Sequence, residues 1–593
     1  MCHNTFHGSC RDIFLYLSVH GMFVADDRLA DKYKNMSLRC ASCVLLMLTI
    51  CSAFPMTAVA AETSDTLSAA SATLAPEAVD SMASHYLRLV TSESDEIFMR
   101  SGERELWSRN SDNAPRLSTS FSLGEETVAK AVNPKSPFGE TKRDYWLAAA
   151  EVIGINAFVQ CFDRFVLDAE YAQINLHTIH HNLKTGFVWD NDQFSTNLFA
   201  HPYHGGLYFN AARSNGLNFW QSVPYAFGGS LMWETMCEIE PPAINDLMAT
   251  TIGGIAIGEV TYRVSDLIYD DSKRGMARFW REFLGTLVCP IRGLNRIIRG
   301  EAWRVRRDGG GRYHDYDRLP VTLSLSAGMR YLADDNAMFR GETNPYVNVG
   351  LVYGDPYDET TNRPYDYFTA DVTFGLSSNQ PLISGIHLLG QLWSAPVYSD
   401  NGMQAEFGLF QHFNYYDSQP VKEGTSLVPF RISEAASVGP GLIYRFPAVG
   451  NLARLEQRIF LSGILLGGSL SDYYSFIDRD YNMGSGYSVK VHTMMDFGRF
   501  GRFMLGADYY NIFTWKGYES HDPATIDPLY LNAQGDKGSA LLFVLTPRLQ
   551  LTLTDNLSLD FSTSYYLRET HYSYHDDVRA HTFTAQLGLA WEL

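Results

Sequence analysis

TFTAQLGLAWEL, residues 582–593, alternates between large apolar side chains and small or polar ones. The residues on one face are Phe583, Ala585, Leu587, Leu589, Trp591 and Leu593. A period of two is the spacing at which successive side chains of a β-strand point to opposite faces. This stretch is therefore predicted to be a strand with one apolar face.

The same alternation repeats upstream, from about residue 319. It is clear in VTLSLSAGMRYL (321–332), in FTADVTFGL (368–376) and in two strands that meet at a tight turn at Asp555 and Asn556. We count roughly twelve such segments, each long enough for the ~9–11 residues of a tilted membrane strand. A soluble β-sandwich would alternate too, but small and polar residues opposite apolar and aromatic ones favour an antiparallel transmembrane β-barrel of about twelve strands.

Two targeting patterns favour the bacterial outer membrane over a soluble sandwich. The Gln586-x-Gly588-x-x-Trp591-x-Leu593 pattern resembles the C-terminal sorting signal of outer-membrane barrels, although an aromatic residue is commoner at the last position. Near the other end, MSLRCASCVLLMLTICSAFPMTAVAAE resembles a secretion signal that begins at Met36. Its A-x-A site predicts a mature chain that starts at Ala61 and a start codon assigned too early; the alternative is a short buried helix.

The composition narrows the classes of function. The net charge of -19 argues against nucleic-acid binding. A run of about 18 charge-free apolar residues is not found, so strands are the expected way to cross a membrane. Cys161, Cys237 and Cys289 follow the predicted cleavage site, and their number and spacing fit neither a disulfide framework nor a zinc ribbon.

The region from Tyr145 to about Tyr269 has a helical pattern. Its first segment, YWLAAAEVIGINAFVQCFDRFV, is apolar but too often interrupted by polar residues for a lipid-facing span. Such a helix is expected inside a bundle or on a membrane surface. Pro241 and Pro242 predict a break between two later helices, and the spacing of Gly254 and Gly258 predicts close approach by another helix.

A basic segment follows, from Lys273 to Arg312, with eleven Lys or Arg residues among aromatic and aliphatic ones. One interpretation is an amphipathic stretch on an anionic bilayer, with residues such as Arg278, Arg281 and Arg292 facing the lipid headgroups. The other is a solvated basic face of a soluble helical bundle.

The expected fold class is multidomain α and β, with a disordered N-terminal segment, an all-α module and a C-terminal antiparallel barrel. The predicted parts are a mis-assigned extension (1–35), a signal peptide (36–60), a disordered linker (61–142), a periplasmic helical module (143–272), a basic amphipathic connector (273–318) and an outer-membrane β-barrel (319–593).

Many ionisable side chains fall in the predicted helical module, which is otherwise apolar. The candidates for a site are His201, His204, Arg213, Glu234, Glu238, Asp246, Glu259 and Arg263. Because buried charges persist only when paired or used, the favoured interpretation is a polar network that locks helices together. Acid–base catalysis, and a metal held by His201, His204, Glu234 and Glu238, are the alternatives.

One short run of residues raises the alternative of a serine nucleophile. Outer-membrane phospholipase A is a twelve-stranded barrel with a His-x-Ser-Asn-Gly run, and this chain has Ser214-Asn215-Gly216. The position of the histidine is held by Ala212, so the serine lacks a neighbouring base.

A longer pattern resembles a domain-of-unknown-function family of Gram-negative envelope proteins, in which a helical module precedes a barrel. The resemblance covers about residues 145–307. Its residues are Asn197, His201, Pro202, Gly205, Tyr208, Ala211, Arg213, Trp233, Glu234, Asn245, Asp246, Thr250, Gly254, Gly258 and Glu259. The resemblance implies location and architecture, and supplies no reaction.

The leading expectation for function is therefore envelope transport or a structural role in the outer membrane. The alternative is an enzyme that acts on lipid or lipid-linked glycan with its site in the helical module. Outer-membrane lipids and the barrel assembly machinery are the expected partners, and the sequence names no cofactor, substrate or small-molecule ligand. A barrel of this size also tends to have a filled interior, so a wide pore is not expected.

Overall fold

The computed structural model describes residues 143–593, except for 191, 306–318, 335–336, 359–362, 422–427, 474–478 and 519–531. The predicted N-terminal extension, signal peptide and linker lie outside the described residues. The described part of the chain falls within one compact unit, residues 133–593.

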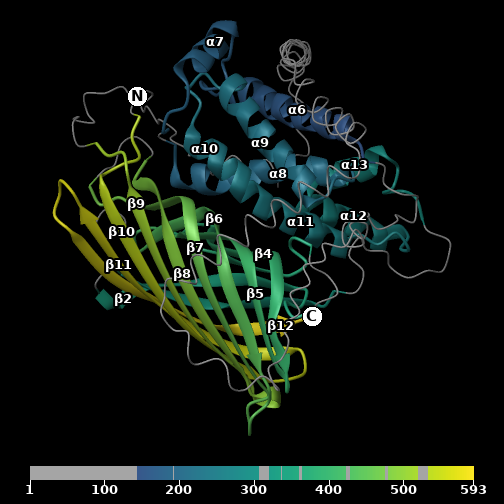
Figure 1. Cartoon of the computed structure of the whole chain (residues 1–593), viewed down its shortest axis with the longest axis vertical. Helices are drawn as coiled ribbons and strands as arrows, with labels where there is room; N and C mark the ends of the chain where they lie inside the picture. The colour runs from purple at the N-terminus through teal and green to yellow at the C-terminus, as the bar shows by residue number, and fades with distance from the viewer. Residues whose placement is uncertain are drawn as a thin grey trace, which may run out of the picture. The chain divides into compact units, whose positions relative to one another are not determined.

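The C-terminal half is a closed β-barrel, as predicted (Figure 1). Within the described residues it has twelve strands: β1 (Val321–Asp334), β2 (Ala337–Tyr353), β3 (Phe368–Gly375), β4 (Ile383–Asp400), β5 (Met403–Asp417), β6 (Arg431–Phe446), β7 (Arg454–Leu470), β8 (Tyr481–Asp496), β9 (Gly501–Thr514), β10 (Gly538–Thr552), β11 (Leu557–Tyr572) and β12 (Val578–Glu592). Each strand pairs antiparallel with its sequence neighbours, and β12 closes the barrel on β1 through pairs such as Leu325 with Trp591.

The two faces of each strand have the chemistry that the alternation predicted. The even-numbered side chains of β12, such as Thr584 and Gln586, line an internal cavity. Leu587, Leu589 and Trp591 point the other way and are exposed on the outside. A polar interior and an apolar exterior are the pattern of a membrane barrel.

Upstream of the barrel lies a helical module, defined here as residues 143–305. Its described helices are α6 (Tyr145–Phe162), α7 (Leu176–Thr185), α8 (His201–Ser214), α9 (Phe219–Met236), α10 (Ile244–Met248), α11 (Gly254–Ile268), α12 (Gly275–Val288) and α13 (Pro290–Ile298). Short π-helical turns, η1 (Asp163–Leu167), η2 (Thr196–Ala200) and η3 (Ala249–Gly253), adjoin α6, α8 and α11.

Helices α8 and α11 form the centre of the module and approach each other through glycine. A Cβ atom on Gly254 would lie 2.6 Å from the backbone of Gly205, and one on Gly206 would lie 3.3 Å from the backbone nitrogen of Gly258. The predicted close helix approach at Gly254 and Gly258 is therefore confirmed. The predicted break at Pro241 and Pro242 separates α9 from α10.

The helical module packs on the outer wall of the barrel, beside strands such as β4, β5 and β6 (Figure 1). Strand β5 shows the boundary, because its outward-facing Phe413 is 0% exposed while its outward-facing Phe407 is 45% exposed. The module supplies Leu198, Ile255 and Ala256 to the same buried cluster that contains Phe413. The module therefore covers part of the outer wall of the barrel rather than its interior.

The module crosses the wall obliquely between the two ends of the barrel. We call the end where β1 begins and β12 finishes the terminal end, and the other the opposite end. At the terminal end, Arg263 pairs with Asp366 in the β2–β3 connection at 3.1 Å. Towards the opposite end, Arg479 in the β7–β8 connection donates to the carbonyl oxygen of Asp190 at 2.6 Å.

Candidate functional sites

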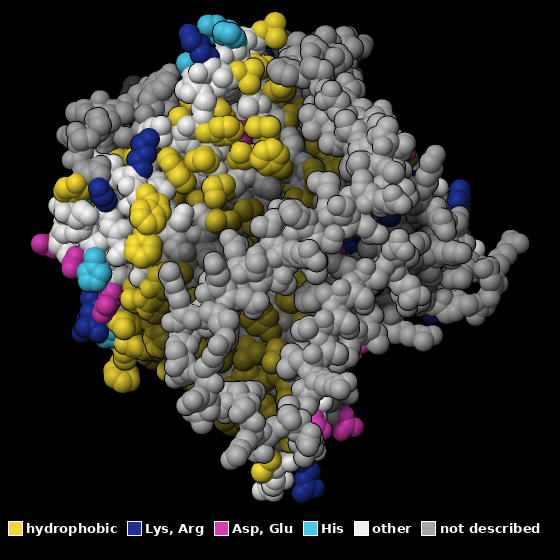
Figure 2. Space-filling model, in the orientation of Figure 1, with side chains coloured by type: hydrophobic (Ala, Val, Ile, Leu, Met, Phe, Trp, Pro, Cys, Tyr) yellow, Lys and Arg dark blue, Asp and Glu magenta, His cyan; other side chains and the backbone are white. Residues whose placement is uncertain are grey.

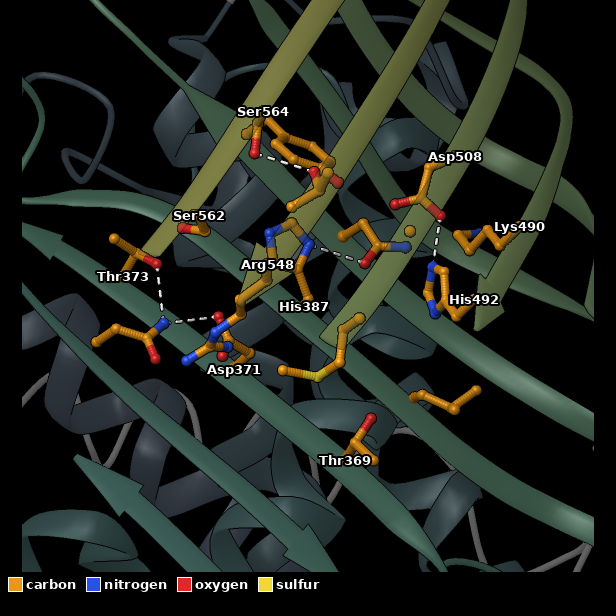
Figure 3. A pocket seen from close by; sticks show the side chains of 18 of the residues that line it. Thr369, Asp371, Thr373, His387, Lys490, His492, Asp508, Arg548, Ser562 and Ser564 are labelled. Carbon is orange, nitrogen blue, oxygen red and sulfur yellow. Dashed lines mark hydrogen bonds and ion pairs between the residues drawn. The ribbon is translucent and has the colours of Figure 1, made fainter. Parts of the chain in front are cut away.

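The barrel interior holds a polar cavity of about 450 Å³. Figure 3 shows side chains from several strands around it, among them Asp371 on β3, His387 on β4, His492 on β8 and Arg548 on β10. The alternation of the strands predicts this polar lining, but it does not distinguish individual lumen residues from one another.

The charges in this cavity are largely neutralised in pairs. Lys490 contacts Glu434 at 2.7 Å, and Arg548 contacts Asp560 at 2.6 Å. The His492 ring lies 2.7 Å from Asp508. Paired charges of this kind cross-brace the strands and leave little net field to select an ion.

Apolar layers lie inside the barrel on both sides of the cavity. On the terminal side, Tyr357 and Tyr367 of the β2–β3 connection pack on Phe410 and Phe460. On the opposite side, Phe430 stacks on Tyr566 with ring centroids 4.0 Å apart. Other members of this second layer are Leu332, Tyr416, Ile432, Tyr510, Ile512, Leu542 and Val544. Within the described residues, these two apolar layers therefore narrow the lumen on both sides of the cavity.

A second group of charges links the helical module to the barrel. Glu259 on α11 is buried and lies 2.8 Å from both Arg213 on α8 and Arg263 on the same helix. Arg263 continues to Asp366, as described above. Burial alone would raise the pKa of Glu259, but the two guanidinium groups outweigh it and hold that pKa below its usual value. Glu259, Arg213 and Arg263 therefore form a buried ionic network that joins α8, α11 and, through Asp366, the barrel.

A third group has a different character. His201 at the start of α8, Glu234 in the last turn of α9 and Asp246 on α10 bring one ligand atom each to within 4.8 Å of one another. The His201 Nε2 atom lies 3.7 Å from an Asp246 oxygen. The chain reversal at Pro241 and Pro242 makes this possible, since it returns α10 to the end of α9. We call these three residues the His201 centre.

The surroundings of the His201 centre are polar and buried. One Glu234 oxygen accepts a hydrogen bond from the backbone N–H of Ala243 at 2.9 Å, while the other oxygen has no hydrogen-bond partner among the described residues. Burial raises the pKa of Glu234 to about 8 and raises that of Asp246, and it lowers the pKa of His201. Asp190, which no local sequence pattern marks, lies beside the centre and accepts a hydrogen bond from the Asn245 side chain at 2.7 Å.

The remaining two candidate ligands lie apart from the centre. The His204 ring packs on the rings of Tyr208 and Trp233, with centroids 4.7 and 5.1 Å away. Glu238 accepts a hydrogen bond from the indole nitrogen of Trp233. These contacts give His204 and Glu238 a role in packing around Trp233.

Ser214 lies at the end of α8, and its hydroxyl is buried without a hydrogen-bond partner among the described residues. The neighbouring Asn215 is held by Glu151. This arrangement lacks the base that a serine nucleophile needs.

The basic segment also differs from its expected orientation. Arg278 donates to the carbonyl oxygen of Ala302 and pairs with Asp271, both from inside the module. Arg292 pairs with Asp266 at 2.5 Å, and Arg296 pairs with Asp271 at 2.6 Å. The expectation that residues such as Arg278 and Arg292 face anionic lipid is therefore wrong. A helical period shows that two faces differ, but it does not show which one is turned inward.

A closed antiparallel barrel with an even number of strands, a polar interior and an apolar exterior is a transmembrane β-barrel of the outer-membrane type. Within the helical module, residues 186–291 match the family described as domain of unknown function (DUF3943). This match falls inside the region where the sequence resembled such a family. No curated protein matches the chain by sequence.

Among solved structures, the chain is similar to outer-membrane channels. The NanC porin shares 10% identity, with 46% of this chain and 100% of that chain covered and a TM-score of 0.23. An outer membrane channel from Pseudomonas putida F1 shares 12% identity, with 49% and 100% covered and a TM-score of 0.23. OmpT of Vibrio cholerae shares 7% identity, with 46% and 97% covered and a TM-score of 0.20. The class stated above rests on the geometry of this chain.

Proposed function

We propose that this protein is a non-conducting outer-membrane protein with a structural role in the envelope, whose barrel anchors the helical module beside it at bilayer depth. The observation that carries the proposal is the orientation of α12 and α13. In these two helices Arg278, Arg292 and Arg296 are turned inward and paired with carboxylates, while the apolar side chains are turned outward.

The outward face of α12 and α13 is large and almost entirely apolar. Its exposed members are Met276, Phe279, Trp280, Phe283, Leu284, Leu287, Leu294, Ile297, Ile298 and, just after α13, Trp303. Exposed patches of this kind are rare on soluble proteins and mark interaction or membrane surfaces. The exposed cations Lys273, Arg274 and Arg304 lie just before α12 and just after α13. Arg278 joins these two segments by contacting both Asp271 and the Ala302 carbonyl oxygen, so the cations lie near one edge of this face, where they could reach a lipid headgroup.

Lipid is the occupant that fits best, because the outer wall of the barrel is apolar too. Figure 2 shows hydrophobic side chains over both the helical module and the barrel on the side in view. Helix α6 adds exposed Trp146 and Phe158. Together with η1 it forms the segment Tyr145–Leu167, which by length and composition alone could cross a membrane, with a hydropathy of 1.3.

The lengths of the connections between strands support one orientation of the barrel in the membrane. Outer-membrane barrels have short periplasmic turns and longer external loops. The β4–β5 turn at the terminal end spans only residues 401–402, whereas the β9–β10 connection at the opposite end spans residues 515–537. This difference supports a periplasmic terminal end. The sequence predicts a periplasmic helical module, whereas its contacts with the outer wall favour the position beside the barrel that is proposed here.

The proposed lack of conductance can be tested in planar bilayers. We expect the purified protein to show no steady conductance in planar bilayers, because two apolar layers in series block the chamber. Tyr357→Ala with Tyr367→Ala removes one layer, and Phe430→Ala with Tyr566→Ala removes the other. Either pair alone should leave the lumen blocked by the remaining layer. The four changes together should produce measurable conductance. Stable porin-like steps from the unmodified protein would contradict the proposal.

The alternative function, an enzyme acting on lipid, is favoured by one observation. The His201 centre lies in a module whose outer face is suited to lipid. An enzyme would turn over outer-membrane lipid, and Glu234→Gln would abolish turnover while the protein stays folded. If the protein is structural, neither the unmodified chain nor Glu234→Gln should turn over lipid in the same assay.

A further inference from the structure

We propose that His201, Glu234 and Asp246 bind one divalent transition-metal cation of the zinc class. The imidazole nitrogen and two carboxylate oxygens come from three different helices. Together they could supply three ligands to the cation and leave one position open for water or another ligand. This inference does not depend on the role of the barrel.

The first support is spacing. Zinc bonds to nitrogen and oxygen ligands are about 2.0–2.2 Å long, so ligand atoms around a tetrahedral ion stand about 3.4 Å apart. The separation of 3.7 Å between His201 and Asp246 is already close to this value. The widest separation in the group, within 4.8 Å, needs only a small side-chain rotation to close.

The second support is a pattern of missing partners. Glu234 and Asp246 are 1% and 3% exposed, and no Lys or Arg forms an ion pair with either in the described part of the chain. One buried oxygen of Glu234 lacks any hydrogen-bond partner there. By contrast, the equally buried Glu259 is held by two arginines at 2.8 Å. Buried carboxylates need a cation or a proton, and a bound metal would supply the cation.

The third support is the outer ring of amides. Asn245 donates to an Asp246 oxygen at 2.7 Å and to Asp190 at 2.7 Å. Asn197 donates to the same Asp190 oxygen at 2.7 Å. Hydrogen bonds of this kind fix the orientation of metal ligands. The histidine nitrogen favours zinc and similar ions over calcium or magnesium, which prefer oxygen ligands alone.

The direct test is Zn²⁺ binding by the full chain, purified in detergent and stripped with a chelator. We expect about one Zn²⁺ per chain by elemental analysis and by calorimetric titration. His201→Gln, Glu234→Gln and Asp246→Asn should each weaken binding by about 100-fold or more, since changing an outer-ring residue alone typically costs 10–100-fold. His177→Gln and Glu170→Gln, which alter exposed residues outside the centre, should bind Zn²⁺ as the unmodified chain does.

Thermal unfolding separates a metal site from a packing network. Zn²⁺ should raise the melting temperature of the unmodified chain, because a ligand that binds only the folded state stabilises it. Without metal, Glu234→Gln should melt no lower than the unmodified chain, and Zn²⁺ should not raise its melting temperature. If this variant folds poorly, His201→Gln and Asp246→Asn provide the same comparison.

Two results would overturn the proposal. One is an unmodified chain that binds no Zn²⁺, Co²⁺ or Ni²⁺ after chelator treatment. The other is equal Zn²⁺ affinity in the unmodified chain and all three ligand variants.

Discussion

Replacing Glu259 by Gln should lower the free energy of unfolding by about 3–5 kcal/mol, because it leaves two buried arginines without their carboxylate. Arg213 and Arg263 both lie 2.8 Å from Glu259 and are themselves buried. Their guanidinium groups would then be only partly satisfied by the Leu217 carbonyl, the Pro364 carbonyl and Asp366. Denaturant unfolding in detergent, followed by tryptophan fluorescence, measures the effect.

A matched control is Glu170→Gln, which removes the same charge from an exposed position. Surface changes of this kind usually alter stability by no more than about 0.5 kcal/mol. A Glu259→Gln protein as stable as this control would show that the network contributes little to the docking of α11 on the barrel.

The same pairing gives a pH dependence. The folded-state pKa of Glu259 lies below its ordinary value of 4.5. Its contribution to stability is therefore fully present above about pH 4.5, and it is lost as the pH falls through the lower folded-state pKa. Glu259→Gln should remove this part of the acid sensitivity.

Replacing Phe283 by Asp should cost about 2.5–3.5 kcal/mol in a bilayer, the range for placing a charge in its hydrocarbon core. Phe283 lies on the exposed apolar face of α12, and a soluble surface would accept Asp there almost without cost. The yield of folded protein in lipid vesicles, read from the gel mobility of unheated samples, should fall for Phe283→Asp.

Leu183→Asp is the control for this change. Leu183 is an exposed apolar residue on α7, a helix whose neighbouring exposed side chains are His180, His181 and Lys184. Its replacement should leave the yield in vesicles unchanged. Equal yields for the two variants would mean that α12 faces water.

The barrel could be predicted from the sequence because each strand separates two environments. In β1 and β12 a polar lumen and an apolar exterior impose the period of two, and the observed pairing of Leu325 with Trp591 joins the two predicted apolar faces. The close approach of α8 and α11 was equally readable, since only glycine tolerates backbone contact at Gly254 and Gly258.

The docking of the helical module could not be predicted in this way. Phe407 and Phe413 are both outward-facing phenylalanines of β5, yet one is exposed and the other is covered by helices. Hydrophobicity does not distinguish a lipid neighbour from a protein neighbour. The His201 centre was predicted only in part, because its third member, Asp246, joins the other two through a tertiary chain reversal, and Asp190 belongs to no local pattern.

The most direct test of the account places a nitroxide spin label at Phe283 in protein reconstituted into lipid vesicles. A second label at the exposed His177 of α7 serves as the reference. The account predicts that the label at position 283 collides mainly with dissolved oxygen, which concentrates in hydrocarbon, and is shielded from a water-soluble nickel chelate. A label at position 283 that meets the nickel chelate as readily as the label at position 177 would contradict a helical module held in the bilayer.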